Sequence, residues 1–134
     1  MSKDTMIMEK ALQIARQARE NAYAPYSGFL VGAAIKPVDS DKIYGGCNVE
    51  NASYGATICA ERGAVMSMLA DIGYTKLEFV LVVTDADPLA VPCAVCLQVL
   101  SEFTLPDTRI LIADLSEVKD YYTMADLLPH PFQF

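Results

Sequence analysis

Two short segments of this 134-residue chain carry side chains that can bind a metal ion and move protons. The first is Cys59-Ala60-Glu61, and the second is Pro92-Cys93-Ala94-Val95-Cys96. Together they supply three thiolate donors and one carboxylate that is not needed as a ligand. Three protein ligands with an open fourth position are typical of a catalytic zinc site, whereas a fourth protein ligand usually closes a structural one. The pattern therefore predicts a zinc ion on the three cysteines, with Glu61 beside the water in the open position.

The positions of the cysteines indicate how they meet. Cys93 and Cys96 are three residues apart in a segment that we expect to be helical after Pro92, so both side chains point to one face. Cys59 stands at the start of another predicted helix. Free backbone N–H groups and the helix dipole lower the pKa of a thiol at such a position. Two helix starts that converge would therefore favour the thiolates that a metal ion requires.

Two charged residues follow the first cysteine. Three thiolates leave a zinc site with a net charge of about −1, which makes a bound water less acidic than neutral ligands would. We expect Arg62 to offset part of this charge by donating hydrogen bonds to a ligand sulfur. Glu61 would take a proton from the water and deliver it to the substrate. The predicted reaction is hydrolytic attack on an sp² carbon.

Other interpretations of these motifs stay open on the residues alone. A Cys-x-x-Cys pair also occurs in redox motifs and in structural zinc sites, and a lone glutamate such as Glu61 is usually a solvated helix residue. Cys47 or His130, the single histidine, could close the site as a fourth ligand. The chain would then be a non-catalytic, zinc-stabilised interaction module. The simpler expectation for Cys47 is a small buried residue at the end of a strand.

Composition and charge limit the kinds of partner. The formal net charge is −7 and no basic patch is evident, which argues against polymeric nucleic acid or a membrane surface. No segment approaches the ~20 apolar residues of a membrane span and no secretory signal is evident, so we expect a cytoplasmic location. The length predicts a single domain over residues 1–134. The hydrophobic content of 53% predicts that apolar surface lies at a subunit interface.

Hydrophobic periodicity predicts the elements that must position the site. Helices are expected over residues 6–22, 58–71 and 92–103, with a final helical turn at 125–128, and strands over 29–37, 42–49, 77–84, 108–113 and 119–123. The first two strands would form a hairpin through the turn at 38–41. Alternating strands and helices after this hairpin predict an α/β layered domain with a mixed sheet.

Five segments resemble the cytidine deaminase family in its three-cysteine form. They are APYSGFLVGAA (24–34), GCNVENASY (46–54), ICAER (58–62), PCAVCLQ (92–98) and DLLPHPF (126–132), which follow the family's order and spacing. The resemblance implies a small homotetrameric enzyme with a three-layer α/β/α fold and a mixed five-stranded sheet. It also implies hydrolytic deamination of cytidine and 2′-deoxycytidine in pyrimidine salvage, with one Zn²⁺ per subunit.

The resemblance implies roles for residues around the substrate. Asn48 and Glu50 would bind the ribose hydroxyls, and such a polar pair discriminates strongly against a substrate that leaves it unpaired. Phe29 would pack against the pyrimidine ring, Val31 would line its pocket, and Ala60 would recognise the base through backbone groups. An aminohydrolase for a cytosine-containing antibiotic such as blasticidin S is an alternative. It need not keep the ribose pair, so the presence of that pair favours a nucleoside.

Two aromatic residues would act between subunits. In this family, the residues that correspond to Tyr54 and Phe132 reach into the site of a neighbouring subunit. The resemblance therefore implies a homotetramer with shared active sites, in agreement with the high apolar content of the chain.

The chain departs from the family pattern beside the predicted zinc site. Ala94 and Val95 replace a smaller pair, and Leu97 replaces an arginine that would help Arg62 to neutralise the sulfurs. The loss of that arginine should leave the bound water less acidic. The small residues at 55–57 beside the base pocket predict tolerance of bulkier groups at the pyrimidine 4-position.

Overall fold

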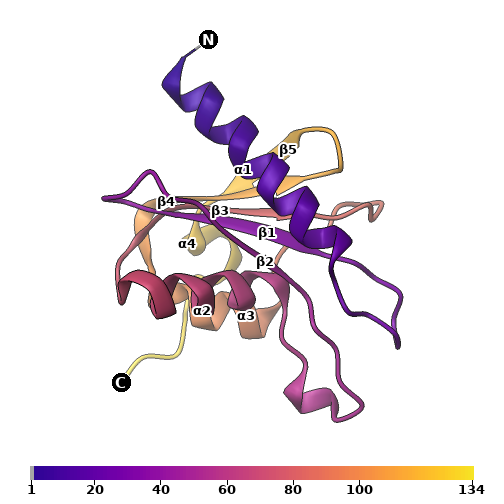
Figure 1. Cartoon of the computed structure of the whole chain (residues 1–134). Coiled ribbons are helices and arrows are strands. Elements are labelled where there is room, and N and C mark those ends of the chain that lie inside the picture. Colours follow the sequence, from indigo (N-terminus) through magenta and orange to yellow (C-terminus); the bar gives the residue numbers. More distant parts are fainter. Residues whose placement is uncertain (1) are drawn as a thin grey trace.

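The computed structural model describes residues 2–134 and contains a mixed five-stranded sheet (Figure 1). The strands are β1 (Gly32–Pro37), β2 (Tyr44–Cys47), β3 (Leu77–Val83), β4 (Thr104–Ala113) and β5 (Val118–Tyr122). Their order in the sheet is β2-β1-β3-β4-β5. Strands β3 and β4 are parallel and the other neighbours are antiparallel. The predicted hairpin is β1–β2, and the predicted mixed sheet of five strands is confirmed.

Helices cover both faces of this sheet and complete the predicted three layers (Figure 1). Helix α1 (Lys3–Glu20) lies on one face, and α2 (Ala60–Ile72), α3 (Ala94–Ser101) and α4 (Met124–Leu127) lie on the other. A single 3-10 turn, η1 (Tyr54–Ala56), precedes α2. Each face has its own hydrophobic core, and β3 contributes to both because nearly all of its side chains are buried.

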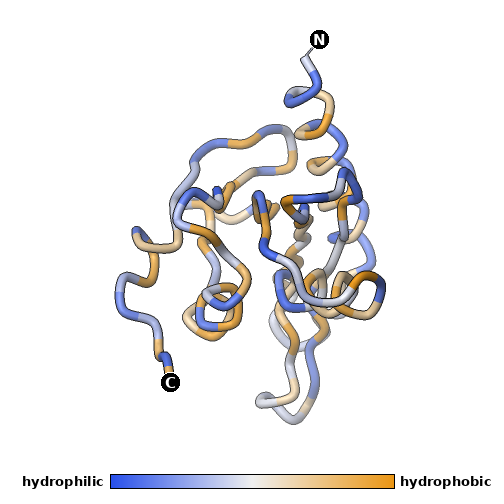
Figure 2. Tube along the Cα trace, turned by 90° about the vertical axis from the view of Figure 1, so that its left-hand side faces the viewer, coloured by the Kyte–Doolittle hydropathy of each residue, from blue (hydrophilic) through white to orange (hydrophobic). Residues whose placement is uncertain are grey.

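Helix α1 packs closely on the sheet because the residues at the contact are small. Its trace alternates between hydrophilic and hydrophobic residues (Figure 2), and its buried residues are Ala11 and Ala15. Opposite them is Gly32 in β1, where a Cβ atom would lie 1.9 Å from the carbonyl oxygen of Ala15. Only glycine therefore allows this approach.

A second close approach sets the position of α2. A Cβ atom on Gly46 of β2 would lie 2.4 Å from both Ala60 O and Ala64 N. The first turn of α2 therefore rests directly on the backbone of β2. Because Cys59 and Glu61 belong to this turn, the contact fixes their height above the sheet.

Most predicted boundaries differ by a few residues from the observed ones. Strand β1 begins at Gly32 instead of residue 29, because the side chain of Asn48 binds the backbone of the preceding residues in place of a sheet partner. Helix α3 begins at Ala94, so Pro92 precedes the N-cap and does not lie in the first turn. Strand β4 begins at Thr104, four residues earlier than expected. Among residues 2–134, no helix combines the length and apolar character that crossing a membrane requires.

Candidate active site

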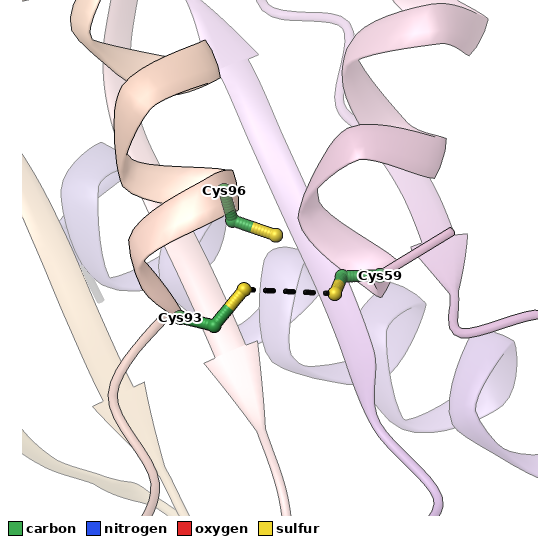
Figure 3. Close-up of side chains that lie close together, drawn as sticks. All are labelled: Cys59, Cys93 and Cys96. Carbon is green, nitrogen blue, oxygen red and sulfur yellow. Dashed lines mark hydrogen bonds between the residues drawn. The ribbon is translucent and has the colours of Figure 1, made fainter. Parts of the chain in front are cut away.

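The three predicted ligands come together where α2 and α3 begin (Figure 3). Cys59 is the N-cap of α2, Cys93 is the N-cap of α3, and Cys96 lies in the first turn of α3. Their Sγ atoms all lie within 4.8 Å of one another. The Cys59 and Cys93 sulfurs are 3.8 Å apart, far beyond the S–S bond length of about 2.05 Å. All three are therefore free thiols.

The sulfur geometry suits a tetrahedral zinc ion. Two sulfurs bound to zinc at about 2.3 Å and at the tetrahedral angle lie about 3.8 Å apart, which is the separation of the Cys59 and Cys93 sulfurs. Neither N-cap cysteine uses its side chain to cap its helix, so both sulfurs are available as ligands. The positive ends of two helices face the cluster and favour thiolates there.

The residues that could have closed this site lie elsewhere. In the chain from residue 2 onward, the cluster of metal-ligating side chains contains the three cysteines alone. Cys47 is at the end of β2 and is only half-buried, not buried as we expected. His130 is exposed near the C-terminus. The geometry therefore leaves the fourth position of a bound ion without a protein ligand, against the closed-module interpretation.

The sulfurs and Arg62 shift one another's proton affinities. A hydrogen bond with Cys96 lowers the pKa of Cys59 to about 5, and Arg62 adds to this effect against the influence of burial. The same hydrogen bond raises the pKa of Cys96. Burial acts to lower the pKa of Arg62, but Cys59 and Cys96 reverse this and raise it. Its Nη2 donates to Thr57 O at 2.9 Å, which holds the cation beside the sulfurs.

Glu61 lies next to the sulfurs in a nearly dry environment. Its side chain is 3% exposed, and burial raises the pKa of its carboxyl to about 7. A group that titrates near neutral pH can both accept and return a proton during a reaction. The position and the environment of Glu61 therefore suit the proton transfer that the sequence predicts.

A cavity of about 220 Å³ opens beside the sulfurs and Glu61. It brings together six predicted site residues outside the sulfur cluster. The lining residues are Phe29, Val31, Asn48, Glu50, Thr57, Cys59, Ala60, Glu61, Val82, Thr84, Ala90, Val91 and Cys93.

Four of these lining residues were not predicted from the sequence. Val82 and Thr84 stand at the end of β3, and Ala90 and Val91 directly precede the second cysteine segment. The position after a buried strand, at the edge where helices begin, was the available signal for Thr84. Thr57 belongs to the small segment 55–57 that we expected beside the base pocket, and it lines the cavity.

The predicted ribose pair is bound to a segment before β1. Asn48 is 8% exposed; its Oδ1 accepts from Val31 N at 2.9 Å, and its Nδ2 donates to Phe29 O at 2.8 Å. The Glu50 carboxylate accepts from the backbone N–H groups of Tyr26 and Ser27. Both side chains therefore shape one wall of the cavity as well as lining it.

Tyr54 and Phe132 lie outside the cavity. Tyr54 is 80% exposed, and its ring contacts that of Tyr26 edge to face. Phe132 is 68% exposed, and the side-chain amide of Gln98 binds both its N–H and its carbonyl oxygen. Within one chain neither residue reaches the site, so their action between subunits stays a prediction.

Comparison with known proteins agrees with this geometry. The family described as "Cytidine and deoxycytidylate deaminase zinc-binding region" matches residues 1–112. The chain belongs to this deaminase family. The cytidine deaminase of Sporosarcina psychrophila is 39% identical over 127 residues, which cover 95% of this chain and 92% of that protein. The cytidine deaminase of Halalkalibacterium halodurans is also 39% identical and covers 95% of each chain.

Solved structures of the family share the fold. The crystal structure of cytidine deaminase from Burkholderia pseudomallei has a TM-score of 0.83 and 39% identity, covering 98% of this chain and all of that one. Cytidine deaminase from Mycobacterium tuberculosis has a TM-score of 0.79 and 34% identity, with full coverage of both chains. The predicted cytidine deaminase-like fold is therefore confirmed.

Proposed function

We propose that this chain is a zinc-dependent cytidine deaminase that converts cytidine and 2′-deoxycytidine to the uridines and releases ammonia. Membership of the deaminase family supports the activity. The observation that carries the proposal is the cavity itself. The sulfurs and buried Glu61 lie at one part of its wall, and the polar side chains of Asn48 and Glu50 lie at another.

Each part of this wall has a task in the proposed reaction. A zinc ion on Cys59, Cys93 and Cys96 would supply an activated water as the nucleophile for C4 of the pyrimidine. Glu61 takes the proton of that water, delivers it to N3 of the ring and then assists protonation of the departing amine. Water and cytidine thus become uridine and ammonia.

The remaining wall residues position the nucleoside. Phe29 packs on the ring, Val31 limits its pocket, and backbone groups of Ala60 bind the base. Asn48 and Glu50 bind sugar hydroxyls. A net charge of −7 disfavours a polyphosphate backbone, so free nucleosides are the proposed substrates rather than polymers.

Substrates with larger 4-substituents are a second part of the proposal. The small residues at 55–57 include Thr57, which lines the cavity. A small side chain at this point of the wall supports the acceptance of a group bulkier than the free amine. The rates of deamination of cytidine and of N4-methylcytidine test this part of the proposal. Turnover of cytidine without turnover of N4-methylcytidine would reject it.

We also propose that the chain is a single domain and forms a homotetramer with one zinc ion per subunit and with active sites shared between subunits. The enzyme would act in pyrimidine salvage in the cytoplasm. Exposed Tyr54 and Phe132 support this assembly, as does the apolar surface of α2 at Met66, Leu69 and Ile72. Contact between such surfaces would bury apolar area that one chain leaves in water.

Ultraviolet absorbance of cytidine during incubation with zinc-loaded protein tests the proposed function. Cytidine should be converted to uridine, and removal of zinc by a chelator should stop the conversion until zinc is restored. Blasticidin S serves as the competing substrate in parallel samples. Turnover of blasticidin S without turnover of cytidine would reject the nucleoside proposal in favour of the antibiotic.

A further inference from the structure

The Glu50 carboxylate is oriented by a turn that lies outside the nucleoside cavity. Its Oε1 accepts from Tyr26 N at 3.0 Å and from Ser27 N at 3.1 Å. Its Oε2 accepts from the hydroxyl of Ser27. A carboxylate offers about four acceptor positions, so three are filled and one is left for a donor in the cavity that Glu50 lines.

The Ser27 hydroxyl also contacts the residue that we place on the pyrimidine ring. It accepts from Phe29 N at 3.0 Å while it donates to Glu50. A continuous chain therefore runs from the Phe29 N–H through Ser27 to the Glu50 carboxylate. Hydrogen bonds in such a chain polarise one another. Ser27 thus joins the part of the wall that meets the base to the part that meets the sugar.

The loop itself is held by other residues. Asn48 binds Phe29 O and Val31 N, and Arg19 Nε donates to Leu30 O at 3.1 Å. The two backbone N–H groups of the turn hold Oε1 of Glu50 without any side chain. The contact that only the Ser27 hydroxyl supplies is the one to Oε2, the oxygen with the free acceptor position.

We propose that Ser27 is a positioning residue for sugar recognition, which aims the free acceptor of Glu50 at a hydroxyl of the nucleoside. This inference rests on the proposed function. The hydrogen bond from Ser27 also lowers the pKa of Glu50, against partial burial, and keeps the carboxylate ionised for this role. Loss of the Ser27 hydroxyl leaves Oε2 of Glu50 free to rotate away from the sugar. The loss therefore weakens the binding only of nucleosides that carry the sugar hydroxyl bound by Glu50.

Two nucleosides and three variants test this proposal. The variants are Ser27→Ala, Ser27→Thr, which keeps a hydroxyl, and the matched control Ser40→Ala. The Ser40 hydroxyl accepts from the N–H two residues ahead, as that of Ser27 does, but it lies in the β1–β2 turn away from the cavity. KM and kcat are measured for cytidine, and Ki in competition is measured for 2′,3′-dideoxycytidine, which lacks the 2′ and 3′ hydroxyls and keeps the 5′ hydroxyl.

Ser27→Ala should raise the KM for cytidine by about tenfold with little change in kcat. Its Ki for the dideoxynucleoside should stay within about twofold of the wild-type value, because this sugar has no 2′ or 3′ hydroxyl for Glu50 to bind. Ser27→Thr and Ser40→Ala should behave like the wild type. An equal loss for both nucleosides would make Ser27 merely structural, and no loss for either would also overturn the proposal. Wild-type protein that leaves cytidine unchanged would instead reject the proposed function, and this inference with it.

Discussion

The sulfur side and the sugar side of the cavity are built in different ways. On the sulfur side, two helix starts place Cys59, Cys93 and Cys96 around one point, and these sulfurs cap neither helix. On the sugar side, the side chains of Asn48 and Glu50 make most of their hydrogen bonds with backbone groups of residues 26–31. The sulfur side is thus specialised for chemistry, whereas the sugar side both forms the wall and binds substrate.

This difference separates two kinds of mutational effect. A change on the sulfur side should remove metal or turnover while the sheet and its cores persist. A change on the sugar side should alter the shape of the wall, so that stability and KM respond together.

Replacement of a predicted ligand should have the largest effect. Cys93→Ser replaces a thiolate sulfur at the zinc site with a hydroxyl oxygen, which binds zinc more weakly. We therefore expect loss of bound zinc and of detectable turnover. Cys47→Ser is the matched control, because Cys47 lies outside the cluster. Zinc content and cytidine turnover measured on both variants check this. Full zinc occupancy in Cys93→Ser would show that the zinc ion does not depend on Cys93 as a ligand.

Replacement of the proposed proton carrier should separate chemistry from metal binding. Glu61→Gln keeps the size of the side chain but removes its proton transfer, so kcat should fall on the order of 1000-fold. Bound zinc should remain at one per chain, because Glu61 is not a ligand. Stopped-assay product analysis with zinc quantification measures both. Turnover near the wild-type level would favour a non-catalytic role for this residue.

The buried carboxyl should also make the stability of the metal-free protein depend on pH. The pKa of Glu61 is raised from its ordinary 4.5 to about 7, so the folded state keeps a proton that the unfolded chain releases. The contribution of Glu61 to the free energy of unfolding should therefore fall as the pH rises from about 4.5 to about 7, by about 3 kcal/mol. Glu61→Gln should lack this fall.

Urea unfolding of both metal-free proteins across this pH range measures the difference directly. A difference between wild type and Glu61→Gln that does not change with pH would contradict the burial argument.

On the sugar side, Asn48→Ala should reduce stability as well as binding. It leaves Phe29 O and Val31 N without their side-chain partner, at a cost of about 2 kcal/mol in the free energy of unfolding. Asn51→Ala is the control, since Asn51 is exposed and binds only the nearby Ser53 N. Denaturant unfolding of the two variants checks the ranking. An unchanged free energy of unfolding in Asn48→Ala would show that Asn48 does not stabilise the wall of the cavity, against the proposed difference between its two sides.

The same division explains what the sequence could predict. Cysteines are rare enough, and their spacing specific enough, that the sulfur cluster and Glu61 follow from two short motifs. The sheet follows from periodic apolar segments, since β3 and its neighbours read as buried strands. The predicted start of β1 at residue 29 was wrong. The apolar residues 29–31 form part of the cavity wall and are held by the side chain of Asn48.

The rest of the site depends on partners distant in sequence. The carboxylate of Glu50 binds backbone N–H groups 23 and 24 residues away, which no local pattern encodes. Thr84 lines the cavity only because β3 pairs between β1 and β4 and ends beside the two helix starts. Such contacts arise from the assembled sheet and are therefore visible only in three dimensions.

X-ray absorption at the zinc edge identifies the atoms bound to the zinc ion and their distances. For the wild-type protein as purified, we expect three sulfur neighbours at about 2.3 Å and one oxygen neighbour at about 2.0 Å. The oxygen signal should change when a nucleoside binds, while the sulfur signal should stay constant. Four sulfur neighbours, or three sulfurs and a histidine nitrogen, would show that a protein ligand closes the fourth position and that the site is not open for catalysis.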